Sequence, residues 1–278
     1  MQKINREKIK MAFAPLVSII IPAFNEERHL RQAIMAIRKS IAVAASSHIS
    51  AELIVVDNES TDNTRKVAEK LADHAYSESR HVIAAVRNTG AFHAKGKYFI
   101  FVDADTLIPP ALVKDFVNIL AGGAVTVGCN VMPSPLNPFE RAVFKTFNLV
   151  LRASVSRGAA FSGNCVGYRR DVFEKLAGFD EERVASEDHD LSNRASKLGK
   201  AVFLKHLTVL TSNRRIRNLG LVSVLFGWGK TTAFYLFGLK RKKYRIARPH
   251  SRFLLVKGKA QQLPRLQSQK RSPSWRRR

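Results

Sequence analysis

Two aspartates, Asp103 and Asp105, stand one residue apart directly after an apolar run at residues 98–102. Such a run of aromatic and β-branched residues is typical of a buried strand. Residues two apart on an extended chain point to the same side, so both carboxylates can reach one cation. Carboxylate oxygens favour Mg²⁺ or Mn²⁺, bound together with substrate phosphates. The pair therefore predicts a metal site that holds a phosphorylated substrate.

A second acidic pair, Glu187 and Asp188, lies within residues 186–190, before a segment with Leu191, Ala195 and Leu198 at helical spacing. A carboxylate in this position can take a proton from a hydroxyl group. The start of a capped helix explains the same residues without any chemistry. Both interpretations can hold, because a base at a helix N-terminus is well placed.

Strand and helix patterns alternate along the first half of the chain. We expect strands over residues 17–22, 52–57, 98–102 and 123–131, a weaker strand over 81–86, and helices over 30–41, 64–71 and 110–120. This rhythm predicts an α/β fold in which a mostly parallel sheet is flanked by helices. Asn25, Asp57 and Asp103 each follow a strand, so they should meet at the sheet edge that binds ligands.

Four segments follow one another at an order and spacing known from an enzyme family: residues 22–26, 56–64, 87–90 and 102–105. Residues 163–164, 178–180 and 187–188 continue the pattern. Over about residues 15–215 the chain therefore resembles the family 2 glycosyltransferases, which have the GT-A fold with a Rossmann-like nucleotide-binding half. A dehydrogenase is a poorer match, because the loop after the first strand has no glycine fingerprint.

The resemblance implies a site for a nucleotide-diphosphate sugar, most simply a UDP-sugar, and a divalent metal, Mn²⁺ or Mg²⁺. In the family, Asp57 would accept a hydrogen bond from the base, Asp103 would hold the ribose and the metal, and Asp105 would be the more direct metal ligand. The remaining residues implied for the donor site are Pro22, Ala23, Asn25, Glu26, Arg87 and Asn88.

The resemblance also implies an inverting transfer in which Asp188 is the catalytic base and Glu187 orients the acceptor or the base. His189 and His206 are candidates for a third metal ligand, although a lone histidine is more often a packing or surface residue. Arg214 and Arg215 could meet the diphosphate or serve as surface charge.

Two departures from the family pattern matter. Glu59 stands where many relatives have a glycine, which would alter the loop conformation or the nucleotide preference. Trp228 lacks the sequence context of the tryptophan motif in processive relatives. We therefore expect one sugar to be transferred per event.

The positive charge is concentrated in the last third of the chain. The 88 residues after Asp190 contain 23 Lys and Arg and no Asp or Glu, whereas residues 1–190 are almost neutral. Residues 216–239 are apolar and helical in pattern, and we expect them to associate with a membrane, although a buried helix would show the same pattern. Residues 240–278 form a basic tail that we expect to be partly disordered and to bind anionic lipid headgroups.

These features favour a peripheral enzyme on the cytoplasmic face of the inner membrane, acting on a lipid or a lipid-linked glycan. Cys129 and Cys165 fit a reducing compartment, and no secretory signal is expected at the start of the chain. Nucleic acid is not the expected partner, because the tail has no recognisable nucleic-acid module. The alternatives are a nucleotidyltransferase on a similar sheet and a non-catalytic protein that binds membranes or nucleic acid. The sugar, the acceptor and the oligomeric state are not identified by the sequence.

Overall fold

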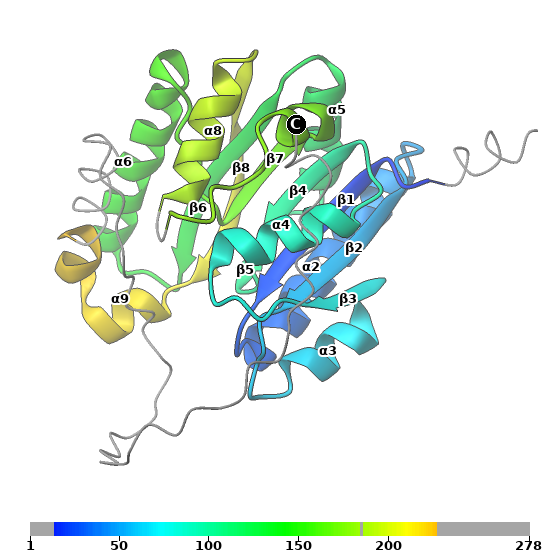
Figure 1. The fold of residues 1–278 in the computed structure, drawn as a ribbon. Helices are drawn as coiled ribbons and strands as arrows, with labels where there is room; N and C mark the ends of the chain where they lie inside the picture. The colour runs from blue at the N-terminus through cyan, green and yellow to red at the C-terminus, as the bar shows by residue number, and fades with distance from the viewer. Residues whose placement is uncertain (1–13, 184–185, 227–278) are drawn as a thin grey trace, which may run out of the picture.

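The computed structural model describes residues 14–183 and 186–226, which are built around one eight-stranded sheet (Figure 1). The strand order across the sheet is β3-β2-β1-β4-β7-β6-β8-β5. The first four of these strands are parallel, and β7 lies antiparallel between β4 and β6. The strands are β1 (Val17–Ala23), β2 (Ala51–Asp57), β3 (His74–Ser77), β4 (Tyr98–Val102), β5 (Thr106–Leu107), β6 (Thr126–Ser134), β7 (Cys165–Arg169) and β8 (Ala201–Ser212).

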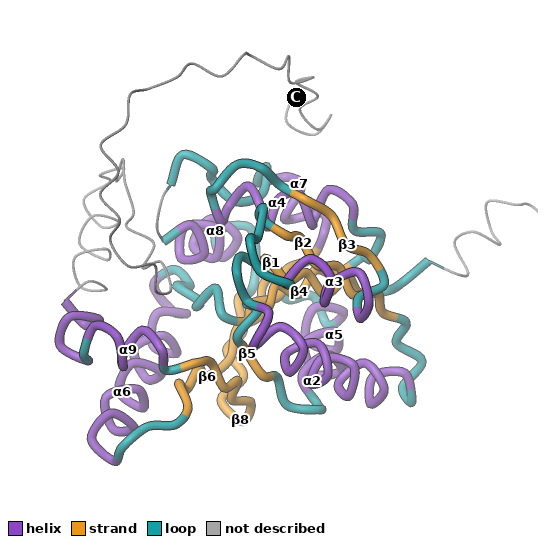
Figure 2. The backbone as a smooth tube through the Cα atoms, turned by 90° about the horizontal axis from the view of Figure 1, so that it is seen from below, coloured by secondary structure: helices purple, strands orange, loops and turns teal. Residues whose placement is uncertain are grey.

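Helices cover both faces of the sheet, as Figure 2 shows. One face carries α2 (Glu27–Ala45), α3 (Thr64–Leu71) and α5 (Leu112–Ala121). The other face carries α4 (Ile83–His93), α7 (Arg170–Lys175) and α8 (Glu187–Ser196). A third group, α6 (Pro138–Ser154), the short 3₁₀ helix η1 (Val155–Arg157) and α9 (Arg214–Leu219), extends from the β6–β8 end.

The central strands are buried on both faces, which explains their nearly continuous apolar sequence. Every residue of β1 and β4 is buried. Gly90 lets α4 approach β1 closely, because a Cβ atom there would collide with the side chain of Ile20. The α/β fold with a mostly parallel, helix-covered sheet is therefore confirmed.

The weak strand expected over residues 81–86 is wrong. Residues from Ile83 onward form α4, and the strand lies earlier, at His74–Ser77, where it pairs with β2. A short apolar run does not distinguish a strand from a buried helix, and the two alanines at 84 and 85 favour the helix.

The expected membrane-associating segment is described only as far as residue 226. Residues 227–239 and the basic tail, 240–278, lie outside the described residues. Within residues 14–183 and 186–226, no helix combines the length and the apolar character needed to cross a bilayer.

Candidate active site

The ends of β1, β2 and β4 bring the predicted donor residues to one edge of the sheet. The parallel register places Ala23 opposite Asp57, and the carbonyl oxygen of Ala23 accepts a hydrogen bond from the Asn58 amide at 2.8 Å. Pro22 pairs with Val56 one residue earlier. Strand β4 pairs with β1 on the side opposite β2, and Asp103 follows β4. The parallel strands therefore bring all these residues to one edge of the sheet.

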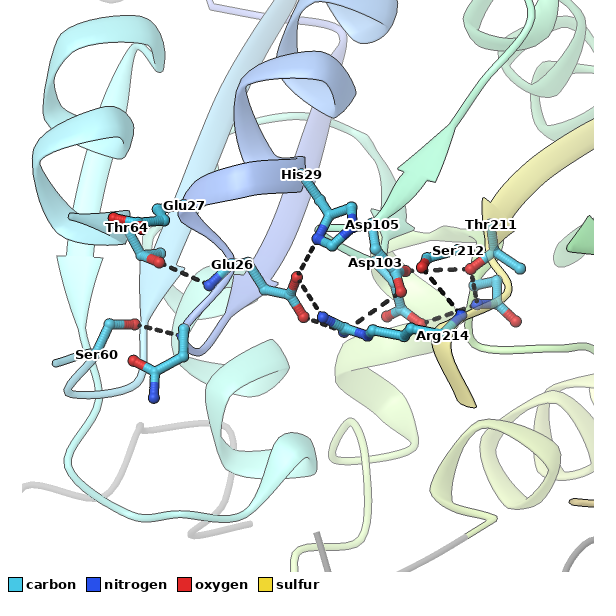
Figure 3. Close-up of polar contacts among 12 residues, drawn as sticks. Glu26, Glu27, His29, Ser60, Thr64, Asp103, Asp105, Thr211, Ser212 and Arg214 are labelled. Atoms are coloured by element: carbon cyan, nitrogen blue, oxygen red, sulfur yellow. Dashed lines mark hydrogen bonds and ion pairs between the residues drawn. The ribbon is translucent and has the colours of Figure 1, made fainter. Parts of the chain in front are cut away.

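The loops after β1 and β2 are tied together by side-chain hydrogen bonds. The Asn25 amide donates to Oγ of Ser60 at 2.9 Å, and Oδ1 of Asn25 accepts from the Thr61 amide at 2.8 Å. The Glu26 amide donates to Oγ1 of Thr64 at 2.7 Å (Figure 3). The turn residues that the sequence places in these loops therefore form one rigid unit beside the strand ends.

The unusual Glu59 keeps the conformation that a glycine would adopt. Its φ is 56°, in the left-handed region that non-glycine residues rarely occupy. Its side chain lies near His81, with 3.4 Å between Oε2 and Nε2. The departure from the family pattern thus leaves the backbone turn intact and adds an acidic side chain to its surface.

Asp57 has an open hydrogen-bonding position. The residue is buried, and its Oδ2 accepts from the Ser60 amide at 3.3 Å. Its Oδ1 is buried and has no hydrogen-bond partner within the part of the chain that the structure describes. A buried polar atom without a partner is costly, so this oxygen is suited to an N–H donor of a ligand.

Arg87 joins the two acidic clusters. It comes from α4, is 3% exposed, and donates from Nη2 to Oδ1 of Asp103 at 2.9 Å and from Nη1 to Oε1 of Glu187 at 2.7 Å. It also donates from Nη2 to the carbonyl oxygen of Gly163 at 3.2 Å. One guanidinium thus connects a carboxylate that the resemblance assigns to the donor site with one that it assigns to the acceptor site, and the two are far apart in the sequence.

The charges in this cluster perturb one another. Burial alone would lower the pKa of Arg87, but Asp103 and Glu187 hold it above its ordinary value. Burial raises the pKa of Glu187, and the neighbouring Asp188 raises it further, against the effect of Arg87. Burial also raises the pKa of Asp103, with Arg87 opposing the shift. The site therefore concentrates negative charge in a setting that favours cations.

Asp105 lies close to the side chain of Arg214, which comes more than 100 residues later in the sequence. Arg214, the first residue of α9, lies with Nη2 at 3.4 Å from Oδ2 of Asp105 and binds both carboxylate oxygens of Glu26 (Figure 3). Oδ1 of Asp105 accepts from Oγ1 of Thr211 at 3.1 Å. Burial raises the pKa of Asp105, with Arg214 lowering it and Glu26 raising it. Glu26, which the sequence assigned to the nucleoside pocket, therefore also neutralises Arg214.

The carboxylate oxygens of Asp103 and Asp105 fit a divalent cation whose remaining ligands come from a substrate. Among residues 14–183 and 186–226, no group of three or more His, Cys, Asp and Glu side chains is arranged to hold a metal. Two carboxylates are nevertheless the usual protein contribution to a Mg²⁺ site that is completed by phosphates. The raised pKa values of Asp103 and Asp105 mark a pair of partly buried acids that a cation would stabilise.

Asp188 lies at the start of α8, beside Gly163. Its Oδ2 accepts from the Gly163 amide at 2.6 Å, and its Oδ1 accepts from the His189 amide at 2.8 Å. A Cβ atom on Gly163 would lie 2.7 Å from Nη2 of Arg87 and 2.9 Å from Oδ2 of Asp188. The glycine therefore permits the acceptor-side carboxylate and the guanidinium to approach each other.

Asn88 and His206 form contacts other than those expected of a donor-site residue and a metal ligand. The Asn88 side chain donates to the carbonyl oxygen of Phe179 at 2.9 Å and accepts from the Phe179 amide at 3.0 Å, so it holds the loop before α8. His206 lies with Nε2 at 3.0 Å from Oδ2 of Asp115 on α5.

Sequence reasoning missed two contributors to the site, Thr211 and Asn164. Oδ2 of Asp103 accepts from Nδ2 of Asn164 at 3.2 Å, and the same Nδ2 lies 3.4 Å from Oγ1 of Thr211. Asn164 was part of the recognised motif without a role. Thr211 lies near the end of β8, and a polar residue at the end of an apolar stretch was the available signal.

The protein also has a surface hollow of about 660 Å³, lined in part by Arg38, Glu52, Asp73 and Lys95. It lies where β1 and β2 begin, at the opposite edge of the sheet from Asp57 and Asp103. It is therefore not the site that these carboxylates form.

Known proteins resemble this chain in sequence and in fold. A family model described as "Glycosyl transferase family 2" matches residues 18–177. The succinoglycan biosynthesis protein ExoA of Rhizobium meliloti is 27% identical over 77% of this chain and 68% of its own length. The glycosyltransferase AglE of Haloferax volcanii is 28% identical over 69% of this chain and 65% of its own length.

A third relative is the undecaprenyl-phosphate 4-deoxy-4-formamido-L-arabinose transferase of Pectobacterium carotovorum, 29% identical over 58% of this chain and 50% of its own length. The chain thus spans between half and about two thirds of these curated relatives.

Solved structures share the fold. The mannosyltransferase PcManGT of Pyrobaculum calidifontis, in complex with GDP-Man and Mn²⁺, matches with a TM-score of 0.59 and 25% identity over 78% of this chain and 65% of its own. The TarS 1-349 fragment of S. aureus, in complex with UDP-GlcNAc, matches with a TM-score of 0.55 and 19% identity over 70% of this chain and 58% of its own. The matched segment, the named relatives and the common α/β architecture together show that this chain belongs to the glycosyltransferase family 2 enzymes, with the GT-A fold.

Proposed function

We propose that the protein transfers one sugar from a nucleotide-diphosphate sugar, a UDP-sugar, to a hydroxyl group by a metal-dependent, inverting single displacement. The observation that carries this proposal is the Arg87 bridge between Asp103 and Glu187. It joins carboxylates suited to a donor and carboxylates suited to an acceptor in one buried network. A nucleotide-binding protein without transfer chemistry has no need of the second cluster.

On the donor side, the unpaired Oδ1 of Asp57 accepts an N–H group of the base. Charge-assisted hydrogen bonds are the stronger ones, so a carboxylate suits an imide donor such as that of uracil. Pro22, Ala23 and Asn25 would line the nucleoside site beside Asp57, because Ala23 pairs with Asp57 and Asn25 is hydrogen-bonded to the loop that follows β2. The UDP-GlcNAc complex of a structural neighbour supports this choice of nucleotide, and the GDP-Man complex of another makes guanine the alternative to test.

Asp103 and Asp105 would hold Mn²⁺ or Mg²⁺ when the donor is bound. The ion would supply neutralisation of the charge on the leaving nucleoside diphosphate. Arg214 exchanges Glu26 for a phosphate oxygen when the donor enters, because its guanidinium already lies between Glu26 and Asp105. Asn164 and Thr211 orient the two carboxylates.

On the acceptor side, Asp188 takes the proton from the attacking hydroxyl group. The acceptor oxygen forms its bond to the anomeric carbon as the bond from that carbon to the diphosphate breaks, and the nucleoside diphosphate leaves. Two backbone amides hold Asp188 in orientation, and Glu187, fixed by Arg87, positions it from the preceding residue. Asn88 contributes by holding the loop at Phe179.

The proposed acceptor is a lipid or a lipid-linked glycan, and the proposed location is the cytoplasmic face of the inner membrane. The name of one relative includes undecaprenyl phosphate, a lipid, and that of another includes the polysaccharide succinoglycan. Residues 216–239 and the tail, 240–278, supply an apolar segment and a polybasic segment, the two signals that stable attachment requires. Equal binding of the chain to anionic and neutral vesicles would contradict the electrostatic part of this attachment.

The experiment that tests the function is a panel of nucleotide sugars with Mn²⁺, read as release of free nucleotide. Asp105→Ala should weaken metal-dependent donor binding, whereas Asp188→Asn should retain donor binding and lose transfer. Asp171→Asn is the matched control, because Asp171 pairs with Arg169 at the surface, at the opposite end of β7 from the site. Transfer that survives both site substitutions would refute the assignment. Failure of the unaltered chain with every donor would favour the non-catalytic alternative.

A further inference from the structure

Helix α6 has three distinct sides, and only one of them is explained by packing. Phe144, Asn148 and Leu151 are buried and face the rest of the molecule. Phe144 forms a small core with Ile216 of α9 and with Val224. This core fixes α6 against α9 and the helical residues 221–226 that follow it, and Figures 1 and 2 both show α6 and α9 side by side.

The outward side of this helical group is apolar. Leu149 and Val150 are each 61% exposed, and Phe139, near the start of the same helix, is 70% exposed. Residues after α9 add to the surface, with Val222 at 80% and Phe226 at 74% exposure. We call this set, with Leu219, the α6–α9 surface. Exposed apolar side chains of this number and size on one small helical group are typical of an interaction site.

A row of basic residues runs beside the apolar one. Arg141, Lys145 and Arg152 are exposed on α6 and recur at spacings that place them on one side of the helix, next to the apolar side. Arg215 and Arg217 are exposed on α9. The one acidic residue of α6, Glu140, is used in the helix cap, where its carboxylate accepts from the Asn137 amide at 3.0 Å.

We propose that the α6–α9 surface docks on an anionic lipid bilayer, with α6 lying parallel to the membrane plane. A helix with an apolar side and a Lys/Arg side is the form that lies in a membrane interface. A second copy of the chain fits less well, because a two-fold contact would bring the basic rows toward each other. Nucleic acid would engage the basic row and leave the apolar one in water.

The position of α9 gives this docking a direction. The helix begins at Arg214, within the candidate active site, and ends at Leu219, on the α6–α9 surface. Its six residues span roughly 9 Å, at 1.5 Å per residue. A bilayer on this surface would therefore lie about one short helix away from the backbone of Arg214, whose side chain reaches Asp105, so a lipid-linked hydroxyl would have a short path to the candidate site.

The inference rests on the proposed membrane attachment, but its test requires no sugar transfer. The described cysteines, Cys129 and Cys165, are both buried, so a cysteine introduced on the surface can be labelled selectively in the full chain. Leu149→Cys carries a polarity-sensitive fluorophore on the α6–α9 surface. Met35→Cys is the matched control, since Met35 is 51% exposed and belongs to α2, a helix that Figure 2 shows away from α6 and α9.

We expect vesicles containing phosphatidylglycerol to shift the emission at position 149 to the blue, and quenchers attached to lipid tails to reach it. Position 35 should change in neither respect. The double substitution Leu149→Glu with Val150→Glu should weaken vesicle binding at least about tenfold, because two apolar side chains are replaced by charges in an interface. Nucleotide-sugar binding should be unchanged in that variant, which separates failure of docking from failure of the proposed function.

Three outcomes would overturn the proposal. Label 149 could remain in water while the full chain is bound to vesicles, which would assign binding to another segment alone. It could be shielded without lipid and independently of protein concentration, which would show that the chain covers its own surface. It could become shielded only as protein concentration rises, which would identify a second copy as the occupant.

Discussion

Replacing Arg87 with methionine tests the link between the two acidic clusters. Methionine has a similar length but neither charge nor hydrogen-bond donors. The substitution leaves Asp103 and Glu187 without the guanidinium that binds each of them, at 2.9 and 2.7 Å. Because Arg87 is almost completely buried, water cannot replace these bonds without rearrangement.

The expected loss in the free energy of unfolding is about 3–5 kcal/mol, the usual cost of removing one partner of a buried ion pair. For a domain of this size it corresponds to a fall in melting temperature of roughly 6–20 °C. The raised pKa values of both carboxyls limit the loss, because either group can take up a proton when its partner disappears. The double variant Arg87→Met with Glu187→Gln should therefore recover part of the stability.

Urea unfolding followed by far-ultraviolet circular dichroism measures the effect. Arg169→Met is the control, because Arg169 forms a surface pair with Asp171 that should contribute at most about 1 kcal/mol. If Arg87→Met costs no more than this control at an unchanged denaturant slope, the guanidinium is not the bridge that stabilises the site.

Three further predictions concern single contacts. Asp57→Asn should weaken binding of free UDP roughly tenfold in a calorimetric titration, because one charge-assisted hydrogen bond is lost; unchanged affinity would exclude Asp57 as the base-binding residue. Gly163→Ala should lower turnover at least about tenfold while donor affinity falls less, because the added methyl group collides with Arg87 and Asp188; steady-state kinetics with the identified donor measures both. The third prediction concerns Glu78. Burial alone would raise its pKa, but Arg80 and Thr89 lower it to about 2, from an ordinary 4.5. Its contribution to stability is therefore complete above pH 4.5 and is lost as the pH falls toward 2, so Glu78→Gln should remove that part of the acid dependence in urea unfolding; an identical pH profile in the variant would contradict this.

The donor edge of the sheet could be predicted because local patterns determine it. Buried strands are continuous apolar runs, and the polar residues that follow them must meet at one edge when the strands are parallel. Asn25, Asp57 and Asp103 illustrate this. The interlocking of the two donor loops was only partly visible, since turn-forming residues such as Ser60 and Thr64 indicate a loop without indicating its partner.

The function of Arg87 could not be predicted in the same way. Its partner Glu187 lies 100 residues later, and only the fold places the two together. The side-chain directions of Arg87 and Asn88 were also not predictable from their shared motif. Adjacent residues on a helix point about 100° apart, so Arg87 reaches the carboxylates whereas Asn88 binds the loop at Phe179.

Helix α6 is an element that sequence analysis left out although its start has a recognisable pattern. Asn137 and Glu140 form a capping box, and Pro138 occupies the first turn. This combination is a known signal for the beginning of a helix. The exposed apolar side of the helix could not have been recognised from the sequence, because apolar residues on more than one side of a helix normally indicate burial.

The short span of α9 has a kinetic consequence. Because one end of this helix contributes Arg214 to the donor carboxylates and the other end belongs to the α6–α9 surface, enzyme and acceptor would meet within a plane and not in a volume. The rate would then follow the mole fraction of acceptor in the bilayer, and adding inert lipid at constant total acceptor would slow the reaction. Michaelis constants expressed as bulk concentrations would change with vesicle load, whereas constants expressed as surface densities would stay the same.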